Sequence, residues 1–371
     1  MHQIAFIDLK KQYEKIQSDI ESAIHKVLAH GQYIFGPEVK AFEEALKSYT
    51  QAPEVISCSN GTDALKLLLM AKGVKKGDAV LVPTFTFAAT AEVVALLQAT
   101  PVFVDICPNT YNMDLLSVEK AIHQAKSLGL NLKGMIAVDL FGLPANYTAL
   151  KEIASANGLW VISDAAQSFG SSINDQKMGT LAEMTTTSFF PAKPLGGYGD
   201  GGAIFTSDLD LADYLRAIRN HGSAKSRYDH EYIGLNGRLD SIQAAILLEK
   251  LKLFPEELTA RQAIANQYEK ALAGIVKTPF IPKGYQSAWA LYTVQCDSDQ
   301  RAHVIKNLEN NHIPYNIYYR KPVHLQPAYE AFPRAEKKLT QAESLTEKVL
   351  SIPMHPYLTE EDLAHIVAQF N

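Results

Sequence analysis

The sequence lacks the features that mark extracellular, membrane and metal-binding proteins. Its 371 residues include only three cysteines, Cys58, Cys107 and Cys296, which are too few and too far apart for a disulfide framework or a metal-ligand pair. No apolar stretch is long enough to cross a bilayer, and the N-terminus lacks the basic segment and apolar run of a signal peptide. We therefore expect a cytoplasmic protein with no membrane association and no metal site.

An excess of positive charge is also missing. Lys and Arg total 35 against 40 Asp and Glu, a formal net charge of −5, whereas nucleic-acid-binding proteins usually present a basic face. We therefore expect no nucleic acid among the partners. The remaining composition, 47% hydrophobic and 20% charged, is typical of a soluble globular enzyme, and the length favours about two domains.

From about residue 50 to 205, short apolar runs alternate with segments of helical periodicity. The expected strands lie at 79–83, 101–105, 134–138 and 159–163. The expected helices lie at 63–72, 90–98, 115–127 and 148–157. This alternation is typical of an α/β protein with a mostly parallel, doubly wound sheet. Such sheets bind ligands in the loops beyond the carboxyl ends of their strands.

A long helical pattern follows the alternating region. It runs from 239 to 252, with a predicted interruption at Pro255, and resumes to about residue 272. The pattern indicates a connection into a second region that mixes helices with short strands. We therefore expect a large ligand-binding domain at 1–255 and a smaller α+β C-terminal domain at 256–371.

The most informative residue is Lys193, which follows an expected strand. Glycine occupies five of the seven positions from 196 to 202, and glycine allows tight turns and close approach of the backbone to a ligand. A lysine shielded from water has a lowered pKa, and its neutral amine forms Schiff bases with carbonyl compounds. A lone lysine in this position would be interpreted as an ordinary solvated loop residue, but two upstream segments argue for the chemical role.

These upstream segments add an acid and an anion site. Asp164 ends an apolar strand, where it would either pair with the ring nitrogen of a pyridine cofactor or cap the following helix; both interpretations are equally good. Gly61 and Thr62 open an expected helix, whose amides and dipole favour a phosphate, although a simple helix cap uses the same residues. An amine, an acid and a phosphate site are together what pyridoxal 5′-phosphate requires.

Three more residues fit the same cofactor, each weakly when taken alone. Ser188 would add a hydroxyl to the phosphate site, Phe87 would stack on the pyridine ring, and Gln167 would hydrogen-bond the phenolic oxygen of the ring. A core aromatic and a solvent-facing glutamine are equally good interpretations of Phe87 and Gln167. The set as a whole predicts lysine-based catalysis on a phosphate-anchored aldehyde.

In combination, these segments resemble those of a known family. Their order and spacing are similar to those of the DegT/DnrJ/StrS-type nucleotide-sugar aminotransferases, on the segments GTDAL (61–65), DAAQ (164–167), SFFPAK (188–193) and GDGG (199–202). Two further segments, GQYIFGPE (31–38) and GLNGRLD (234–240), also match. The resemblance extends over nearly the whole chain, from about residue 6 to residue 356.

The resemblance implies a fold-type I enzyme that uses pyridoxal 5′-phosphate to aminate a nucleotide-linked ketosugar. L-glutamate would be the amino donor and would leave as 2-oxoglutarate, and Lys193 would bond to the cofactor and carry the proton. The other residues expected at the cofactor are Gly61, Thr62, Phe87, Asp164, Gln167, Ser188 and Asn236. The resemblance also implies a homodimer with shared active sites, in which Asn236 reaches the phosphate bound by the neighbouring subunit; from the residues alone Asn236 would be a turn residue.

Within the family, the resemblance is strongest to members that aminate a nucleotide-linked 3-oxo-uronate for surface polysaccharides such as O-antigen. Arg238 would suit the uronate carboxylate as a bidentate partner, although a structural salt bridge explains it equally well. Tyr319 and His324 are also expected at the substrate. The chain departs from its relatives between these two residues, with Tyr-Arg-Lys-Pro at 319–322 where Tyr-Pro-aliphatic-Pro is usual. The two added cations face either the substrate or solvent.

Other functions stay open, among them amination of another UDP- or dTDP-linked 3- or 4-ketosugar, sugar dehydration and a different fold-type I carbon–nitrogen chemistry. Relatives that dehydrate sugars have a histidine in place of the cofactor lysine, so Lys193 argues against that chemistry. A catalytically silent regulatory protein on the same fold is a further alternative, which the intact set of Lys193, Asp164 and Ser188 opposes.

Overall fold

The computed structural model describes residues 4–226 and 228–370, and its centre is a seven-stranded sheet with the order β1-β9-β8-β5-β4-β2-β3. The strands are β1 (Glu54–Cys58), β2 (Asp78–Pro83), β3 (Thr100–Val104), β4 (Asn131–Val138), β5 (Trp160–Asp164), β8 (Met184–Ser188) and β9 (Gly202–Thr206). Neighbours from β3 across to β8 pair in parallel, whereas β9 runs antiparallel to both β8 and β1. The sheet is therefore mostly parallel, as the alternating sequence pattern predicts.

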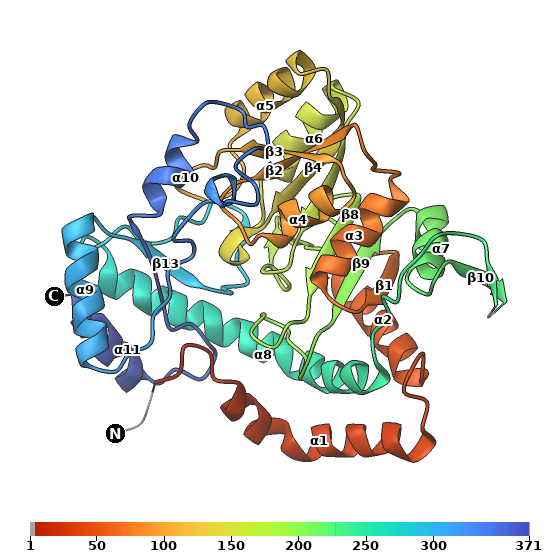
Figure 1. The fold of residues 1–371 in the computed structure, drawn as a ribbon. Helices are drawn as coiled ribbons and strands as arrows, with labels where there is room; N and C mark the ends of the chain where they lie inside the picture. The colour runs from red at the N-terminus through yellow and green to blue at the C-terminus, as the bar shows by residue number, and fades with distance from the viewer. Residues whose placement is uncertain (1–3, 227, 371) are drawn as a thin grey trace.

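Helices connect the strands and pack on the sheet (Figure 1). They are α3 (Gly61–Ala71), α4 (Ala89–Leu96), α5 (Leu115–Ser127), α6 (Tyr147–Ala156) and α7 (Leu209–Ile218). In α3, the fully buried Leu67, Leu68 and Leu69 pack in the main core against the sheet, and α3 lies on β8 and β9. Because α3 follows β1 directly, this packing brings its first turn close to the end of β8.

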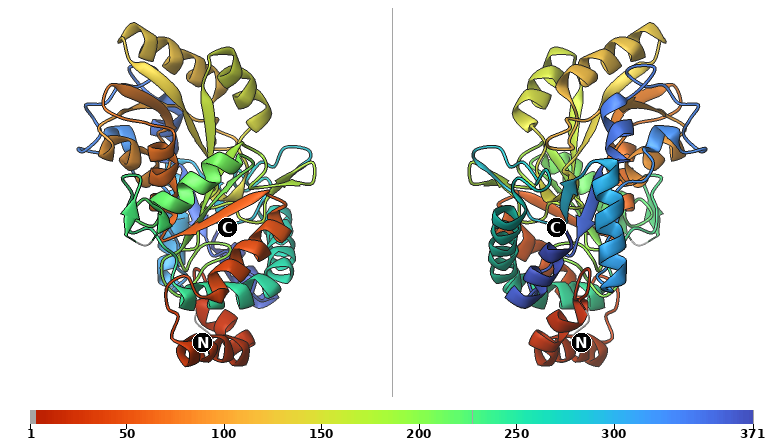
Figure 2. Two further views of the ribbon diagram at one scale, coloured as in Figure 1. Left: turned by 90° about the vertical axis from the view of Figure 1, so that its right-hand side faces the viewer. Right: turned by 90° about the vertical axis from the view of Figure 1, so that its left-hand side faces the viewer.

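The N-terminal helices lie against the longest helix of the protein. Helix α1 (Leu9–His30) and helix α2 (Pro37–Thr50) both contact α8 (Ser241–Leu272). Figures 1 and 2 show α1, in red, next to α8, in teal, at one end of the molecule. None of the helices within 4–226 and 228–370 has the length and apolarity needed to span a membrane.

The predicted interruption at Pro255 is wrong, because α8 continues through this residue as one helix (Figure 1). A proline inside a helix loses one backbone hydrogen bond and crowds the preceding turn. Here tertiary contacts on both sides hold the helix: Phe254 is fully buried in a hydrophobic cluster, and Glu257 accepts two hydrogen bonds from Gln12 Nε2, at 2.8 and 3.0 Å. These contacts outweigh the local preference.

The C-terminal region has its own hydrophobic cluster. Strand β13 (Tyr292–Gln295) pairs antiparallel with β14 (Val349–Ile352), and the cluster includes Tyr268 and Leu272 from the second half of α8. The remaining elements are β6 (Ser172–Ile173), β7 (Gln176–Lys177), β10 (Ser223–Ser226), β11 (Asp229–His230), β12 (Tyr285–Gln286), α9 (Ser298–Asn310), α10 (Thr340–Leu345), α11 (Glu360–Val367), and the 3-10 helices η1 (Leu140–Gly142), η2 (Val323–Leu325) and η3 (Ala368–Phe370). The division into domains at 255/256 stays a proposal, since α8 spans it.

A buried cation on α8 gives a first testable prediction. Lys250 is 1% exposed, and its Nζ lies 4.7 Å from the ring centroid of Tyr198 with no hydrogen-bond partner among the described residues. Burial lowers the pKa of Lys250 to about 8, against the opposing attraction of Glu257. We expect Lys250→Met to raise the free energy of unfolding at pH 7 by about 1–2 kcal/mol, because a desolvated charge is replaced by an apolar chain of similar length.

The pH dependence of this gain tests its cause. A folded-state pKa below the unfolded value penalises folding most below pH 8, and the penalty disappears as the pH rises towards the ordinary lysine value of 10.5. Urea denaturation of both proteins at pH 7 and pH 10 should therefore show a gain that shrinks at the higher pH. A variant less stable than the wild type at pH 7 would show instead that the ammonium is well solvated or paired.

Candidate active site

A cavity of about 620 Å³ opens at the carboxyl ends of β5 and β8. Eight of the eleven predicted site residues line it, namely Gly61, Thr62, Phe87, Asp164, Gln167, Ser188, Lys193 and Tyr319. These residues come from five separate segments of the chain. Seven of them meet because the carboxyl ends of parallel strands share one edge of the sheet, whereas Tyr319 comes from the C-terminal region, before η2.

Lys193 and Asp164 have pKa values shifted by burial in the same cavity. Desolvation lowers the pKa of Lys193, and the negative charge of Asp164 partly opposes this change. Desolvation likewise raises the pKa of Asp164, while hydrogen bonds from Thr90 and Ala166 and the charge of Lys193 act in the other direction. The amine is thus shifted towards the neutral form, which is the nucleophile and the proton acceptor.

The carboxylate of Asp164 is held by a hydrogen bond on each oxygen. Its Oδ2 accepts from the Thr90 hydroxyl at 2.9 Å, and its Oδ1 accepts from the Ala166 backbone N–H at 3.2 Å. The side chain is 6% exposed and faces the cavity. Thr90 was not among the residues expected from the sequence, which shows nothing that joins a helix residue to an acid 74 positions later.

The start of α3 is the candidate anion site. Asn60 caps the helix by accepting from the Asp63 N–H at 2.7 Å, and within the described residues no protein acceptor meets the N–H groups of Gly61 and Thr62. These two amides lie at the positive end of the helix dipole, where a phosphate is favoured. Asn60, the capping residue, was missed because the resemblance begins at Gly61.

Two glycines are required by close packing around this anion site. A Cβ on Gly61 would lie 2.8 Å from the Cβ of Ser188, and a Cβ on Gly202 would lie 2.5 Å from the backbone of Asn60. Only glycine therefore allows the end of β8 and the start of β9 to approach the first turn of α3 this closely. As a result, the hydroxyl of Ser188 and the free amides are brought to the same end of the cavity.

Gln167 and Phe87, the residues expected around the cofactor ring, both line the cavity. The Gln167 Oε1 accepts from the Phe141 backbone N–H at 2.9 Å, and the NH₂ group, which has two protons, also hydrogen-bonds Tyr319. Phe87 lines the cavity and is 63% exposed, so it is not a core aromatic. Tyr319 lies on the same cavity and packs edge-on against Phe85.

His324 does not lie in the cavity lining. It is 1% exposed; its Nδ1 lies 2.5 Å from the Thr84 hydroxyl oxygen and its Nε2 lies 3.3 Å from Glu343 Oε1. Both ring nitrogens are thus occupied by protein groups, and the expectation of a substrate contact by His324 is not supported by this geometry. The ring instead joins the segment after β2 to α10.

Asn236 and Arg238 also lie outside the cavity lining. Asn236 is exposed and pairs through its backbone with Asn220, and Arg238 Nη1 donates to Asn220 Oδ1 at 3.0 Å. The two residues share one loop before α8. Their expected roles at the cofactor and substrate stay predictions.

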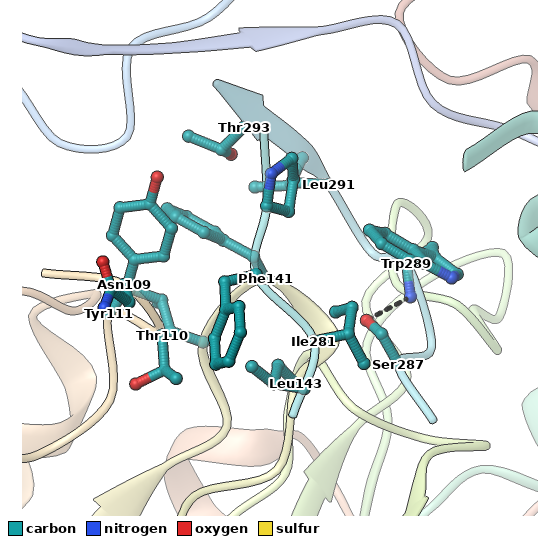
Figure 3. Close-up of a pocket in the computed structure, with 13 residues that line it drawn as sticks. Asn109, Thr110, Tyr111, Phe141, Leu143, Ile281, Ser287, Trp289, Leu291 and Thr293 are labelled. Atoms are coloured by element: carbon teal, nitrogen blue, oxygen red, sulfur yellow. Dashed lines mark hydrogen bonds between the residues drawn. The ribbon is translucent and has the colours of Figure 1, made fainter. Parts of the chain in front are cut away.

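Figure 3 shows a second, smaller hollow. Leu291 lines both spaces, and Phe141 and Trp289 also border the hollow, where the Trp289 N–H donates to Ser287 Oγ at 3.1 Å. Its volume of about 20 Å³ holds about one water molecule. The hollow is therefore too small for a cofactor.

A second buried carboxylate, Asp139, lies beneath the site at the end of β4. Its Oδ1 accepts from the Ala145 N–H at 2.8 Å and the Tyr147 hydroxyl at 2.6 Å, and its Oδ2 accepts from the Ser168 hydroxyl at 2.7 Å. Burial raises the pKa of Asp139 to about 7, with a smaller contribution from the charge of Asp164; the three donors oppose the shift.

This raised pKa predicts that stability is lost as the pH rises from acidic to neutral values. Because the ordinary value is 3.8, the folded protein binds the proton more tightly, and stability falls as the pH rises from about 4 through 7, by at most about 4 kcal/mol. We expect the stability of Asp139→Asn to depend less on pH, because an amide does not titrate. The variant should still fold, since the amide oxygen accepts from Ala145 and Tyr147 and the NH₂ group donates to Ser168. Urea denaturation at pH 5 and pH 8 measures this; an equal pH dependence in both proteins would contradict it.

An amine of lowered pKa, a fixed acid and a helix-end anion site at one edge of a mostly parallel α/β sheet define a pyridoxal-phosphate-dependent enzyme of the aminotransferase class. The chain belongs to the DegT/DnrJ/EryC1/StrS aminotransferase family, whose sequence profile matches residues 14–371. The enzyme class, the fold and the cofactor expected from the sequence are thereby confirmed.

Similar proteins match over nearly the whole chain. The UDP-2-acetamido-2-deoxy-3-oxo-D-glucuronate aminotransferase of Pseudomonas aeruginosa is 46% identical over 98% of this chain and 99% of its own length. A crystal structure of a DegT DnrJ EryC1 StrS aminotransferase from Brucella abortus has a TM-score of 0.97 at 48% identity, covering 99% and 98% of the two chains. The S. venezuelae DesV structure, in complex with a ketimine intermediate, has a TM-score of 0.94 at 35% identity, covering 100% and 98%.

Proposed function

We propose that the protein transfers the amino group of L-glutamate to UDP-2-acetamido-2-deoxy-3-oxo-glucuronate, making its 3-amino sugar for surface-polysaccharide (O-antigen) precursors in the cytoplasm. The observation that supports transamination most directly is the single cavity that holds Lys193, Asp164 and the free amides of α3. The full-length similarity to the P. aeruginosa enzyme supports the choice of substrate.

The residues of the cavity fit pyridoxal 5′-phosphate. Bound, the cofactor supplies an aldehyde that bonds to amines and a ring that withdraws electrons from the neighbouring carbon. In our proposal Gly61, Thr62 and Ser188 hold its phosphate, and Asp164 keeps its ring nitrogen protonated. Lys193 would hold the cofactor through its Nζ, and the same amine, once free, would move the proton between the substrate carbon and the cofactor within each half-reaction.

The other cavity residues orient the ring. Phe87 offers an exposed aromatic face for stacking, and the NH₂ group of Gln167 donates to the phenolic oxygen. Tyr319 forms part of the cavity wall, and we propose that it contacts the sugar. These contacts hold the reacting bond in one orientation, which favours proton transfer over side reactions.

We also propose a homodimer with shared active sites, in which Asn236 reaches the phosphate bound by the partner subunit. Exposed apolar side chains near the cavity and the 228–238 loop support an interface. Their exposed fractions are 48% for Tyr33, 44% for Ile34, 41% for Phe35, 52% for Phe190, 83% for Tyr228 and 87% for Ile233.

The test of the proposed reaction is the absorbance spectrum of the cofactor-loaded protein before and after L-glutamate. The long-wavelength band of the lysine-bound cofactor should give way to the shorter-wavelength band of the amine form, with release of 2-oxoglutarate. The 3-oxo-uronate nucleotide should then restore the first spectrum. If a different UDP- or dTDP-ketosugar restores the first spectrum and the uronate does not, the proposed substrate is wrong but the protein is still a sugar aminotransferase.

Arg238 gives a separate test of the uronate. We propose that its guanidinium pairs with the sugar carboxylate in a bidentate contact. Arg238→Lys should then lower kcat/KM for the uronate by about 10-fold to 100-fold, and should change the rate for the matching sugar without a carboxylate by less than about 3-fold. An equal loss for both sugars would assign Arg238 to the structure of the 228–238 loop.

A further inference from the structure

One side-chain donor hydrogen-bonds the carboxylate of Asp164, the acid of the site. Asp164 is 6% exposed, and within the described residues the only side chain that hydrogen-bonds it is Thr90, whose Oγ1 lies 2.9 Å from Oδ2. The second donor, the Ala166 N–H, is longer at 3.2 Å and belongs to the backbone, so no substitution of Ala166 other than proline removes it.

The direction of the Thr90 hydrogen bond is fixed by proton counting. An ionised carboxylate only accepts, and a threonine hydroxyl has one proton, so Thr90 donates to Asp164. The remaining lone pairs of Thr90 Oγ1 face Thr86, whose Oγ1 lies 3.4 Å away. At 3.4 Å the contact between the two hydroxyls is long, so the shorter Thr90–Asp164 hydrogen bond is the one that acts on the carboxylate.

The fold leaves Thr90 little freedom to point elsewhere. It is 1% exposed in the first turn of α4, whose Ala91, Val93 and Val94 are fully buried in the main core. A β-branched side chain in a helix has few χ1 rotamers. Thr90 also lines the same cavity as Asp164, so its hydroxyl acts at the edge where the cofactor ring would lie.

We infer that Thr90 is a positioning residue of the transamination: its hydroxyl holds the Asp164 carboxylate ionised and turned towards the ring nitrogen of the cofactor. This inference rests on the proposed pairing of Asp164 with that nitrogen. Burial favours the protonated acid, and the hydroxyl opposes burial by stabilising the charged form. Removal of the hydroxyl therefore shifts the acid towards its neutral form, in which it no longer holds a proton on the ring.

The test compares Thr90→Val, which keeps the shape and loses the hydroxyl, with Thr90→Ser, which keeps the hydroxyl. Two quantities are measured on the full-length protein: the dissociation constant of pyridoxamine 5′-phosphate, by fluorescence, and the acidic limb of kcat/KM against pH. For Thr90→Val we expect about 10-fold weaker cofactor binding and a limb moved up by about one pH unit. Thr90→Ser should restore both to within about 3-fold and 0.3 units.

A cofactor analogue with carbon in place of the ring nitrogen separates positioning from packing. Wild type and Thr90→Val should bind the analogue equally, because it offers nothing for Asp164 to pair with. A Thr90→Val protein that loses affinity for the analogue as much as for the natural cofactor would overturn the inference, since the threonine would then act through packing. So would a Thr90→Ser protein that behaves like Thr90→Val.

Asp164→Asn distinguishes failure of this inference from failure of the proposed role of the acid. If Asp164→Asn weakens cofactor binding and moves the limb while Thr90→Val matches the wild type, only the role of Thr90 is refuted. If Asp164→Asn matches the wild type in both measurements, the pairing of Asp164 with the ring is refuted, and the inference about Thr90 falls with it. If Asp164 pairs with the ring and Thr90 acts through Asp164, the double variant should lose no more cofactor affinity than Asp164→Asn alone.

Discussion

Lys193→Ala lowers kcat/KM for the glutamate half-reaction by roughly 10⁴-fold, because the variant loses both the covalent anchor and the proton carrier of the site. No other lysine lines the cavity within the described residues, so no neighbouring amine replaces it. The measurement is the rate of 2-oxoglutarate formation from L-glutamate in the cofactor-loaded protein, together with the long-wavelength absorbance band, which should be absent.

The controls show whether the loss is chemical. Lys76→Ala makes the same change at an exposed position and should leave the rate within about 2-fold of the wild type. Lys193→Ala should still bind pyridoxamine 5′-phosphate, because the amides of Gly61 and Thr62 are unchanged. Small added amines should restore part of the proton transfer. A Lys193→Ala protein that turns over at the wild-type rate would refute the assignment of this lysine.

Most of the sheet could be predicted because its strands are buried on both faces. A continuous apolar run bounded by polar turns marks such a strand, and the runs at 79–83, 101–105 and 134–138 fall on β2, β3 and β4 to within three residues at either end. The helix expected at 115–127 matches α5, whose start is fixed by the local cap of Asp114 on the Ser117 N–H. Local sequence patterns are sufficient to predict a strand or helix where the local signals and the burial of the element agree.

Contacts between distant segments could not be predicted in the same way. The interruption expected at Pro255 follows from the local rule, whereas the continuous α8 depends on contacts such as that of Gln12 with Glu257. Thr90 likewise acquires its importance only when α4 packs against the end of β5. A single sequence does not reveal such pairs, since neither partner is unusual in its own segment.

The same difference between local patterns and distant contacts explains which predicted site residues line the cavity and which lie outside it. Those in loops at the carboxyl edge of the sheet meet in the cavity, because topology alone brings that edge together. His324 lies 240 positions from its partner Thr84, and its direction is set by packing that the resemblance does not specify. Asn236 and Arg238 lie on a loop outside the cavity lining, and the contact that we propose for Asn236 requires a second copy of the chain, which a single sequence does not place.

At a cofactor concentration too low to load Asn236→Ala, mixing this variant with the inactive Lys193→Ala should restore activity if the active sites are shared. Lys193→Ala removes the lysine, and Asn236→Ala removes the amide that we propose reaches the partner's phosphate. A mixed dimer has one intact site, formed by Lys193 of one chain and Asn236 of the other, and one site with both defects. Random reassociation makes half of the dimers mixed, so activity should rise from near zero to about a quarter of the wild-type value.

The same mixture measured without subunit exchange is the matched control, and it should show only the sum of the two residual activities. Asn236→Ala alone should bind cofactor about 10-fold to 100-fold more weakly, because a donor to a charged phosphate is lost while the chain's own cavity lining is untouched. Exchange with no gain in activity would place the complete site within one chain. Asn236, exposed and outside that chain's cavity, would then belong to the turn before α8, and the dimer would no longer be required for catalysis.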